Sequence, residues 1–555
     1  MGIRDLFKFN GGIKPAYNKE PSTGLPIAEA PLPAELVIPL QQSIGGTPRP
    51  LVKAGDLVKK GQLIGWPDGP VSSSVHASTS GIVKAIEPRL MPHSSGLSAP
   101  CVILEPDGKD EWIDLKPVPW RTMEAGEVRD TLRDAGVVGL GGAVFPSYMK
   151  VNPGKKGKLD TLIINGAECE PFITCDDLQM RERPEGVIKG AAILRDLTQA
   201  GQVLIGIEDN KPEAIAAMKA AVERTGEARI EIVPIPTRYP AGGAKQLIRV
   251  LTGIEVPHGK RSTDYGVQCF NSGTAYAVYE ALELGKPLIS RIVTVAGNVE
   301  APRNYEVLFG TPMRDVIALA KAKPDTDRII MGGPMMGFRM PADDVPVVKA
   351  TNCILVGSPT LFPPPPPEMP CIRCGECARH CPVDLQPFEM YWFSRARILG
   401  KAQEYHLFDC IECGCCAYVC PSRIPLVDYF RFAKSEIWAR EKEKEAADTA
   451  RERYEFRLER EERDKAEKAA KLAAKAAETK AKLAQQEAAA QAGGQAAAPA
   501  DDAKKALIEA AMEKARQQKA ETAPKNTENL TREQQAQVAE VEARRAKIEE
   551  SQRAE

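Results

Sequence analysis

Apolar residues follow two distinct patterns along the first half of the chain. Between residues 30 and 115, short apolar runs are interrupted by Gly and Pro, which is typical of strands joined by tight turns. This pattern predicts β-structure throughout the segment. The runs that define it are Leu36-Val37-Ile38, Gln62-Leu63-Ile64, Gly81-Ile82-Val83 and Val102-Ile103-Leu104.

In residues 120–285, helical stretches alternate with short β-rich runs. Continuous apolar strands between helices indicate a parallel sheet that is covered on both faces. Ligands of such sheets bind beyond the carboxyl ends of the strands. The sequence therefore predicts a Rossmann-like α/β domain with a ligand site at that edge. The expected helices lie at 124–135, 185–197, 212–223 and 274–284, and the expected strands at 159–165, 203–207 and 229–235.

Three further segments differ in composition. Residues 289–340 are again β-rich and predict a small β-grasp module. Pro363–Pro367 form a stiff spacer, because proline fits neither a helix interior nor a central strand. Residues 445–555 are rich in Ala, Lys, Glu and Gln, and no aromatic residue follows Phe456. Such a low-complexity tail buries too little apolar surface to order itself, so we expect fluctuating helix or disorder there.

The β-rich segment at 30–115 resembles a biotinyl- or lipoyl-type barrel, over Val52–Gln62 and Val75–Val83. Carrier domains of that kind display a lysine in the hairpin between these halves. Residues 73–79 contain no lysine. We therefore expect an unmodified structural module, a barrel-sandwich, at this place.

Charge and hydropathy exclude several classes of protein. The chain has 555 residues, and Lys+Arg 74 against Asp+Glu 75 gives a formal net charge of −1. That balance argues against a protein that binds nucleic acid through its overall charge. The sequence has no apolar stretch of about 18 residues that could span a membrane, and residues 1–8 lack the apolar core of a secretory signal. The sequence predicts a cytoplasmic chain.

Nine of the 14 cysteines lie between Cys371 and Cys420. The spacing C-x2-C-x2-C-x3-C-P occurs twice there, with starts 39 residues apart. In this bacterial ferredoxin spacing, three close thiolates wrap one 4Fe–4S cluster and the fourth reaches the other cluster. Residues 368–430 therefore predict a two-cluster ferredoxin domain. The predicted ligands are Cys371, Cys374, Cys377 and Cys420 for one cluster, and Cys410, Cys413, Cys416 and Cys381 for the second.

Zinc is the alternative metal for this segment. A structural zinc ion takes four ligands, usually as two pairs with a longer interval between them, so eight cysteines in this duplicated order fit zinc poorly. Cys415 lies outside the spacing, and we expect it to be a small residue beside a cluster. Because a cluster moves one electron at a time, the chain needs a second site that takes up electrons from a substrate.

A glycine-rich loop at 136–146 is a candidate for that second site. It contains Gly139, Gly141, Gly142 and Phe145 and is followed by Lys150. The loop is no Rossmann fingerprint, because it lacks G-x-G-x-x-G and follows a helix. Its glycines would let backbone N–H groups approach a phosphate or a flat ring, with Lys150 supplying charge. On these residues alone, an ordinary loop is an equal alternative.

Polar residues at the end of the next predicted strand support the same site. Asn165 ends that strand and is followed by Glu168 and Glu170. The amide of Asn165 can form paired hydrogen bonds, and the carboxylates can accept hydrogen bonds from ribose hydroxyls. A solvated turn is the alternative interpretation.

These motifs together resemble the flavin- and NADH-binding subunit of respiratory complex I. Their order over about residues 8–430 is similar to that of the RnfC family, the C subunits of the Rnf (Rsx) electron-transport complex. That order runs from Gly11–Pro15 through the barrel, the glycine loop, Asn165–Pro171, Tyr239–Leu247, Val256–Gly259, Asn271–Thr274 and Gly332–Gly337 to the two cysteine runs.

The resemblance implies a noncovalent FMN, with NAD(H) as substrate. NADH gives two electrons together, and a flavin can accept both and release them singly to clusters. The flavin would carry the chemistry, so no side chain is expected to be catalytic by itself. By resemblance, Gly139, Gly141, Gly142, Lys150, Asn165, Asn271 and Thr274 cradle FMN, and Phe145, Glu168 and Glu170 face the nicotinamide nucleotide.

The resemblance also implies a place in a larger assembly. We expect an electron-transfer subunit of an ion-translocating oxidoreductase complex, peripheral to the cytoplasmic side of the inner membrane. Its partners would be membrane-embedded and iron–sulfur subunits of that complex. Two alternatives stay open: an NADH-oxidising subunit of a soluble hydrogenase or formate dehydrogenase, and a flavin-free scaffold that carries clusters.

Overall fold

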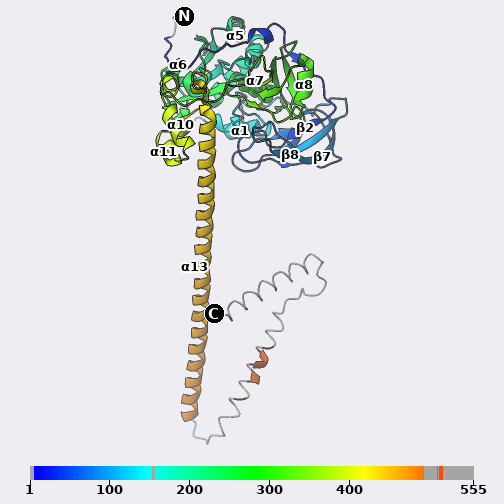
Figure 1. Ribbon diagram of the computed structural model, residues 1–555. Coiled ribbons are helices and arrows are strands. Elements are labelled where there is room, and N and C mark those ends of the chain that lie inside the picture. The colour runs from blue at the N-terminus through cyan, green and yellow to red at the C-terminus, as the bar shows by residue number, and fades with distance from the viewer. Residues whose placement is uncertain are drawn as a thin grey trace. The chain divides into compact units, whose positions relative to one another are not determined.

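A computed structural model describes residues 5–152 and 157–492, together with isolated positions between 505 and 516. The chain divides into two compact units, Met1–Glu443 and Lys444–Glu555. The first unit contains a barrel, a central α/β layer, a mixed sheet and the cysteine-rich segment (Figure 1). No helix among the described residues is both long and apolar enough to cross a membrane.

The N-terminal barrel is built from two small antiparallel sheets, with strand orders β2-β8-β7-β4 and β3-β5-β6. Alternate residues of the predicted apolar runs supply its core, where Leu36, Ile38, Ile64 and Leu104 are fully buried. The strands are β2 (Leu36–Pro39), β3 (Arg49–Pro50), β4 (Leu57–Val58), β5 (Leu63–Trp66), β6 (Val75–His76), β7 (Gly81–Leu90) and β8 (Ser98–Pro106).

The central layer is a parallel sheet with strand order β11-β10-β9-β12. All three strands and all four helices expected from the sequence are present, and β12, α2, α3 and α6 are additional. The strands are β9 (Thr161–Gly166), β10 (Gln202–Glu208), β11 (Ile230–Ile235) and β12 (Val267–Asn271). The helices are α1 (Ala125–Asp134), α2 (Ser147–Lys150), α3 (Cys175–Glu182), α4 (Pro184–Thr198), α5 (Pro212–Thr225), α6 (Ala244–Thr252) and α7 (Ser272–Glu283).

A mixed sheet of six strands follows, in the order β1-β14-β13-β17-β15-β16. It recruits two strands from outside the predicted 289–340 module, namely β1 and β17. Helix α8 (Met313–Ala320) packs on this sheet through Val316 and Ile317. The strands are β1 (Ala28–Glu29), β13 (Ser290–Gly297), β14 (Arg303–Leu308), β15 (Arg328–Met331), β16 (Phe338–Arg339) and β17 (Cys353–Gly357).

Buried Lys349, which lies between β16 and β17 of the mixed sheet, connects that sheet with the barrel and the central layer. The Nζ of Lys349 donates to the carbonyl of Ser74 in the barrel (2.9 Å) and to that of Gly136 beside the central layer (2.6 Å). Burial lowers the pKa of Lys349 to about 7. The two carbonyls replace the water that the ammonium group loses, so removing either would leave a costly buried donor.

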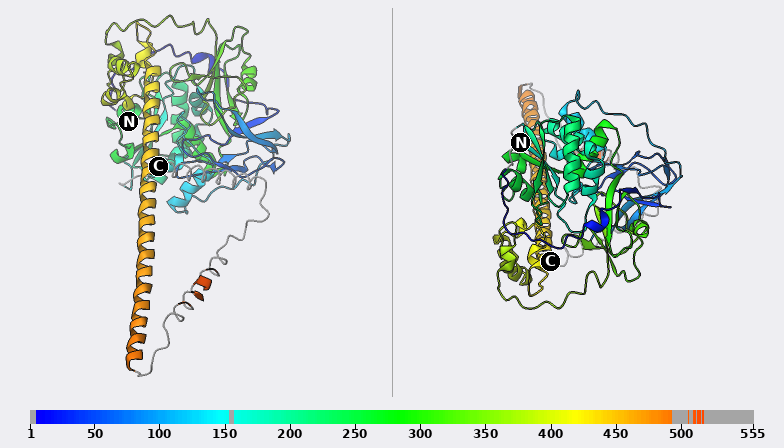
Figure 2. Two further views of the ribbon diagram at one scale, coloured as in Figure 1. Left: turned by 60° about the horizontal axis from the view of Figure 1, so that its bottom comes forward. Right: turned by 90° about the horizontal axis from the view of Figure 1, so that it is seen from above.

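The cysteine-rich segment lies beside the central layer, on the side away from the barrel (Figures 1 and 2). Its buried residues form a core of their own that includes Met390, Tyr391 and Phe430. The helices are α9 (Glu376–Arg379), α10 (Pro387–Arg395), α11 (Leu399–Glu404), α12 (Cys415–Tyr418) and α13 (Leu426–Ala492). Short 3-10 turns lie at η1 (Glu20–Ser22), η3 (Ser262–Tyr265) and η4 (Leu407–Asp409).

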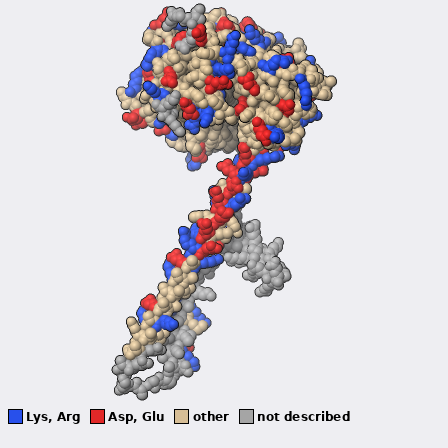
Figure 3. Space-filling model, turned by 90° about the vertical axis from the view of Figure 1, so that its left-hand side faces the viewer, with Lys and Arg blue, Asp and Glu red and all other residues tan. Residues whose placement is uncertain are grey.

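Helix α13 continues without a break into the second unit. Its first turns pack into the cysteine-rich core through Leu426, Phe430 and Ile437, whereas residues 455–486 are exposed. Positive and negative side chains alternate over the upper part of this exposed helix (Figure 3). Ion pairs one turn apart support a helix that has no packed core. These pairs are Arg457–Glu461, Glu467–Lys471 and Glu478–Lys482. The rest of the predicted 445–555 tail lies largely outside the described residues.

Candidate functional site

Two neighbouring parallel strands end at the same edge of the central sheet. Asn165, near the end of β9, is the register partner of Asn271 at the end of β12. The chain runs from β9 through β10 to β11 and then crosses to β12 on the other side of β9. Open α/β sheets bind their ligands at such a reversal of strand order. The sequence did not predict β12, so the pairing of the two asparagines is a finding of the structure.

The glycine-rich loop reaches this same edge. The backbone N–H of Leu140 donates to Oγ1 of Thr274 (2.8 Å) at the start of α7. A Cβ added at Gly141 would lie 3.5 Å from the Cβ of Asn271, which is ordinary contact distance. The loop, Asn271 and Thr274 are therefore neighbours, although more than 120 residues of sequence separate them.

The tip of the loop presents bare backbone. Gly139 N–H donates to the carbonyl of Phe145 (2.9 Å) and folds the loop onto itself. Gly142 has φ +106°, a conformation that L-residues with a side chain rarely adopt, and a Cβ there would meet nothing within 4 Å. The space above Gly142 is thus open to a ligand that approaches the backbone.

Asn271 forms the N-cap of helix α7. Its Oδ1 accepts hydrogen bonds from Gly273 N–H (2.9 Å) and Thr274 N–H (3.3 Å), and its Nδ2 donates to Asp176 Oδ2 (2.6 Å). The positive end of the helix dipole therefore faces the sheet edge, where it favours a negatively charged group such as a phosphate.

Lys150 lies against β12. Its Nζ donates to the carbonyl of Cys269 and lies 4.5 Å from the centroid of the Phe270 ring. Burial lowers the pKa of Lys150. Its ammonium group is thus held against β12, two residues before Asn271. It adds positive potential to the site without being part of the glycine-rich loop.

The two predicted acids take different places. The carboxylate of Glu168 accepts from the N–H groups of Asp176 (2.6 Å) and Asp177 (3.2 Å), and burial raises the pKa of Glu168 to about 8. Glu168 therefore connects to Asn271 through Asp176. Glu170 instead accepts from the N–H groups of Met335 (2.7 Å) and Met336 (3.0 Å) in the mixed-sheet unit.

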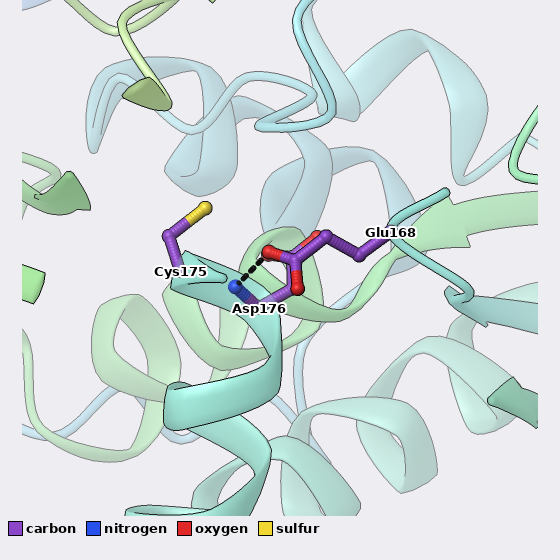
Figure 4. A group of neighbouring side chains, drawn as sticks. All are labelled: Glu168, Cys175 and Asp176. Atoms are coloured by element: carbon purple, nitrogen blue, oxygen red, sulfur yellow. Dashed lines mark hydrogen bonds between the residues drawn. The ribbon is translucent and has the colours of Figure 1, made fainter. Parts of the chain in front are cut away.

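Glu168, Cys175 and Asp176 bring three potential metal-ligand atoms within 4.8 Å of one another (Figure 4). Each already has a partner in the fold. The Glu168 carboxylate caps α3, and Asp176 accepts from Asn271. Buried Arg291 interacts electrostatically with Cys175 and Asp176. Because a guanidinium group already balances the negative charge, the group is a structural network of the sheet edge rather than a metal centre.

The second cysteine run encloses a small cavity. Cys410, Cys413 and Cys416 line it together with Cys381 from the first run. This is the ligand set that the spacing predicts for one 4Fe–4S cluster. Burial raises the pKa of the Cys410 thiol to about 11, and a bound metal ion would favour its thiolate form.

Two hydrogen bonds hold the segment before the first cysteine run against the segment after Cys420. Met369 N–H donates to the carbonyl of Ser422 (3.0 Å), and Ser422 Oγ donates to the carbonyl of Pro370 (2.9 Å). These two bonds bring the segment before Cys371 beside the segment after Cys420. The fold thus supports the exchange of fourth ligands between the two runs.

A shared core joins the second cysteine run to the sheet edge. Ile13, Cys169, Tyr239, Cys413 and Cys415 are buried together in it. Tyr239 Oη donates to the carbonyl of Cys413 (2.7 Å). The peptide bond between Tyr239 and Pro240 is cis.

The same core continues to the predicted flavin residues. Cys169 Sγ accepts from the N–H of Gly242 (3.2 Å), and the carbonyl of Gly242 accepts from Nδ2 of Asn165 (2.8 Å). Hydrogen bonds and packed side chains therefore lead from Asn165 to Cys413 without leaving the protein interior.

Sequence reasoning did not assign roles to Tyr239, Cys169 or Met335. In the sequence, the consecutive glycines Gly332 and Gly333 could have indicated a close approach of this loop to another part of the chain. A Cβ at Gly333 would lie 2.3 Å from Cγ of Glu170, so only glycine lets this loop close onto the acid. The carbonyl of Met335 then lies next to Gly414 of the second cysteine run, 3.1 Å from where a Cβ would stand.

Family comparisons agree with this organisation along the chain. Residues 7–109 match the RnfC barrel sandwich hybrid domain, 132–280 the Nuo51 FMN-binding domain, 292–339 the SLBB domain and 370–424 the 4Fe-4S dicluster domain. A curated protein of Pseudomonas aeruginosa, named as the C subunit of an ion-translocating oxidoreductase complex, is 48% identical over 407 residues, 73% of this chain. The chain belongs to the RnfC family, the C subunits of ion-translocating oxidoreductase complexes.

Relatives with the same name occur in Serratia proteamaculans (47% identical) and Yersinia pestis (46%), each over 73% of this chain. The chain spans 52%, 57% and 65% of the length of the three relatives. Among solved structures, a NAD+-reducing [NiFe]-hydrogenase in the H2-reduced state is 18% identical with a TM-score of 0.40, covering 53% of this chain and 59% of that chain. This structural likeness is too low to bear on function.

The expected fold class is confirmed: barrel-sandwich, α/β FMN-binding domain, β-grasp-type SLBB module and two-cluster ferredoxin domain. FMN and 4Fe–4S clusters are the cofactors of these domains. The geometry fits both groups, because the glycine loop leaves open backbone beside a helix N-terminus and four thiols line one cavity.

Proposed function

We propose that this protein exchanges electrons between NAD(H) and the other subunits of an ion-translocating oxidoreductase complex. FMN, when bound at the sheet edge, supplies the conversion between two-electron and one-electron transfer. The two clusters supply one-electron steps toward the partner subunits.

One observation carries the proposal: the second cysteine run is packed directly against the elements that end at the sheet edge. Tyr239 contacts the backbone of Cys413, and Cys169 lies between Tyr239 and the Asn165–Gly242 contact. A cluster held by Cys381, Cys410, Cys413 and Cys416 would therefore be the one next to the flavin site. It would exchange single electrons with the flavin site on one side and with the cluster of the first run on the other.

The residues at the edge divide the work of binding. The backbone at Gly139–Gly142 and the N-terminus of α7 would hold the phosphate end of FMN. Asn165 and Asn271 lie at the two strand ends of this edge, and Lys150, which donates to the carbonyl of Cys269 in β12, would add positive charge. By resemblance, Phe145 and Glu168 would face the nicotinamide nucleotide, whereas Glu170, also expected there, accepts hydrogen bonds from Met335 and Met336.

The proposed location is the cytoplasmic face of the inner membrane, as a peripheral subunit. The name shared by the relatives describes a complex that moves ions, and ions are translocated across a membrane. NAD(H), the proposed substrate, is a cytoplasmic nucleotide. Membrane-embedded subunits and an iron–sulfur subunit are therefore the proposed partners.

An anaerobic NADH titration tests the proposal. We expect bleaching of flavin absorbance followed by cluster absorbance in the purified native protein. Glu168→Ala should reduce the rate of flavin reduction by roughly tenfold, which corresponds to about 1.4 kcal/mol of lost interaction, and should leave the iron content unchanged.

Glu182→Ala is the matched control, because Glu182 is an acid at the far end of helix α3 whose carboxylate accepts from Ile27 N–H, away from the sheet edge. An unchanged rate in Glu168→Ala, or loss of iron, would show that Glu168 has a structural role only. A native preparation that retains clusters and flavin but is not reduced by NADH would refute NAD(H) as the substrate.

A further inference from the structure

Residues 11–19 form an N-terminal strap that contacts both ends of the proposed flavin-to-cluster path. Its first half, Gly11–Pro15, carries part of the family resemblance but has no role in the proposed function. Apart from an isolated bridge at Ile13, the strap has no regular secondary structure. Its position is therefore determined by its contacts with other segments.

The first end of the strap lies against the loop that carries a predicted cluster ligand. Gly12 N–H donates to the carbonyl of His380 (3.0 Å), the residue directly before Cys381. A Cβ at Gly11 would lie 2.5 Å from the carbonyl oxygen of Cys381 itself. Because Gly11 also has φ +56°, only glycine lets the strap approach this backbone so closely.

The middle of the strap pairs with the segment that contacts the second cysteine run. Ile13 and Tyr239 exchange two backbone hydrogen bonds, of 2.8 and 3.0 Å. A Cβ at Gly12, where φ is +77°, would lie 2.7 Å from the carbonyl oxygen of Tyr239. Tyr239 in turn donates to the carbonyl of Cys413. Short backbone contacts thus connect the strap with Cys381 and Cys413, two of the four ligands predicted for one cluster.

The second end of the strap holds the loop at residues 168–173, beside the sheet edge. Lys19 is buried, and its Nζ donates to the carbonyls of Glu168 (2.8 Å), Glu170 (2.9 Å) and Ile173. An ammonium group has three N–H donors, so every donor of Lys19 is used on this one loop. The strap consequently fixes the backbone from which Glu168 projects.

We propose that the strap is a positioning element, which holds the second cysteine run at a fixed separation from the sheet edge. One segment contacts both places, so neither can shift without disturbing it. Electron transfer slows steeply as two centres move apart. Each step moves one electron, so one centre is oxidised and the other is reduced, and no bond forms or breaks. The inference rests on the proposed function in taking the sheet edge as the flavin site and the second run as its electron partner.

Gly12→Ala tests the cluster end of the strap. The added Cβ would meet the carbonyl of Tyr239 and displace the strap from His380. In the full chain loaded with its cofactors, a laser flash with EDTA as electron donor reduces the bound flavin without NADH, and cluster absorbance is then followed. We expect electron transfer to the clusters to be about tenfold slower than in the native protein, with unchanged iron content. Gly24→Ala is the matched control, because a Cβ there would meet nothing within 4 Å.

Hydrogen exchange of the resting protein gives a readout that does not depend on electron transfer. Amides of residues 380–385 should exchange about tenfold faster in Gly12→Ala and at the native rate in Gly24→Ala. Native-rate electron transfer in Gly12→Ala would overturn the inference, and so would slower transfer without faster exchange. Loss of iron from Gly12→Ala would overturn it as well, because the strap would then be needed to hold the cluster rather than to place it.

Lys19→Met releases the opposite end of the strap and decides the matter if Gly12→Ala does not fold. We expect flash-driven electron transfer to slow about tenfold, with unchanged iron content. Lys14→Met, which changes an exposed lysine of the same strap, should behave as the native protein does. Native-rate transfer in Lys19→Met would contradict the inference. Because NADH is absent from all these measurements, its failure to reduce the flavin would refute only the proposed substrate.

Discussion

The two cysteine runs have the same backbone conformation but differ in how far their cysteines are buried. Equivalent residues take matching left-handed conformations, with φ 55° at Arg373 and 56° at Glu412, and 77° and 78° at the glycines that follow, Gly375 and Gly414. In each run an N–H donates to the first sulfur at 3.4 Å, from Arg373 to Cys371 and from Glu412 to Cys410. The local sequence therefore determines the cluster cradle in both halves.

Burial differs because the neighbours differ. Cys413 and Cys416 of the second run are each 7% exposed, beneath Tyr239 and the loop of Met335. Cys374 of the first run is exposed to solvent. Solvent exposure and hydrogen bonds to sulfur set cluster potentials, so clusters held by the two runs would differ in potential. The second run packs against the α/β domain, so under the proposed function its cluster would lie nearer the flavin site.

The largest expected effect comes from removing one cluster at a time. Cys416→Ser eliminates the buried cluster, and we expect at least a roughly hundredfold slower reduction of the remaining cluster by NADH, because the flavin site then lacks its neighbouring acceptor. Cys374→Ser eliminates the exposed cluster and should leave rapid NADH reduction of the buried one. Stopped-flow absorbance with EPR of the remaining cluster measures both.

If both variants reduced their remaining cluster equally fast, the order of the clusters would be wrong. Dithionite reduction serves as the control, since it should reduce the remaining cluster fully in either variant. Failure of that control would mean loss of the cluster rather than loss of the path.

The exchange of fourth ligands predicts the next largest effect. Cys420→Ser should remove or alter the exposed cluster held by Cys371, Cys374 and Cys377, with loss of up to about half of the iron. Cys381→Ser, its counterpart, should damage the buried cluster instead. EPR assignment against the single-cluster variants decides between this and ligation within each run: damage to the opposite clusters would refute the exchange.

Much of this comparison could be predicted from the sequence. The spacing of the cysteines predicts eight ligands and their pairing, because each run is local and its geometry depends on nearby glycines and prolines. The helices and strands of the central layer followed from continuous apolar runs between helical stretches. Asn165 was correctly placed near a strand end for the same reason.

The difference between the two runs could not be predicted, because it depends on contacts between residues distant in sequence. Ile372 and Ile411 occupy the same position in the two runs. Their burial differs because Tyr239 and Met335 pack against the second run. Strand β12 was missed because Val267–Asn271 is short and follows the irregular segment at 253–266. Its position beside β9, which pairs Asn271 with Asn165, is a property of the sheet order alone.

The smallest effect tests the charge contrast between the runs. Glu412 accepts hydrogen bonds from Arg431 (2.9 Å) and buried Lys434 (2.8 Å). Although burial acts to raise it, these bonds hold the pKa of Glu412 below its usual range. Glu412→Gln leaves Lys434 without its carboxylate and should lower the free energy of unfolding by about 1–2 kcal/mol.

Arg373→Gln changes the equivalent, exposed position and should alter stability by no more than about 0.5 kcal/mol. The urea midpoint for loss of cluster absorbance at neutral pH compares the two variants with the native protein. Equal shifts would mean that the two runs are stabilised alike and that burial of the second run contributes nothing through Glu412. A shift confined to Glu412→Gln would mean that the ion pair between Glu412 and Lys434 stabilises the second run. The first run has arginines at both equivalent positions.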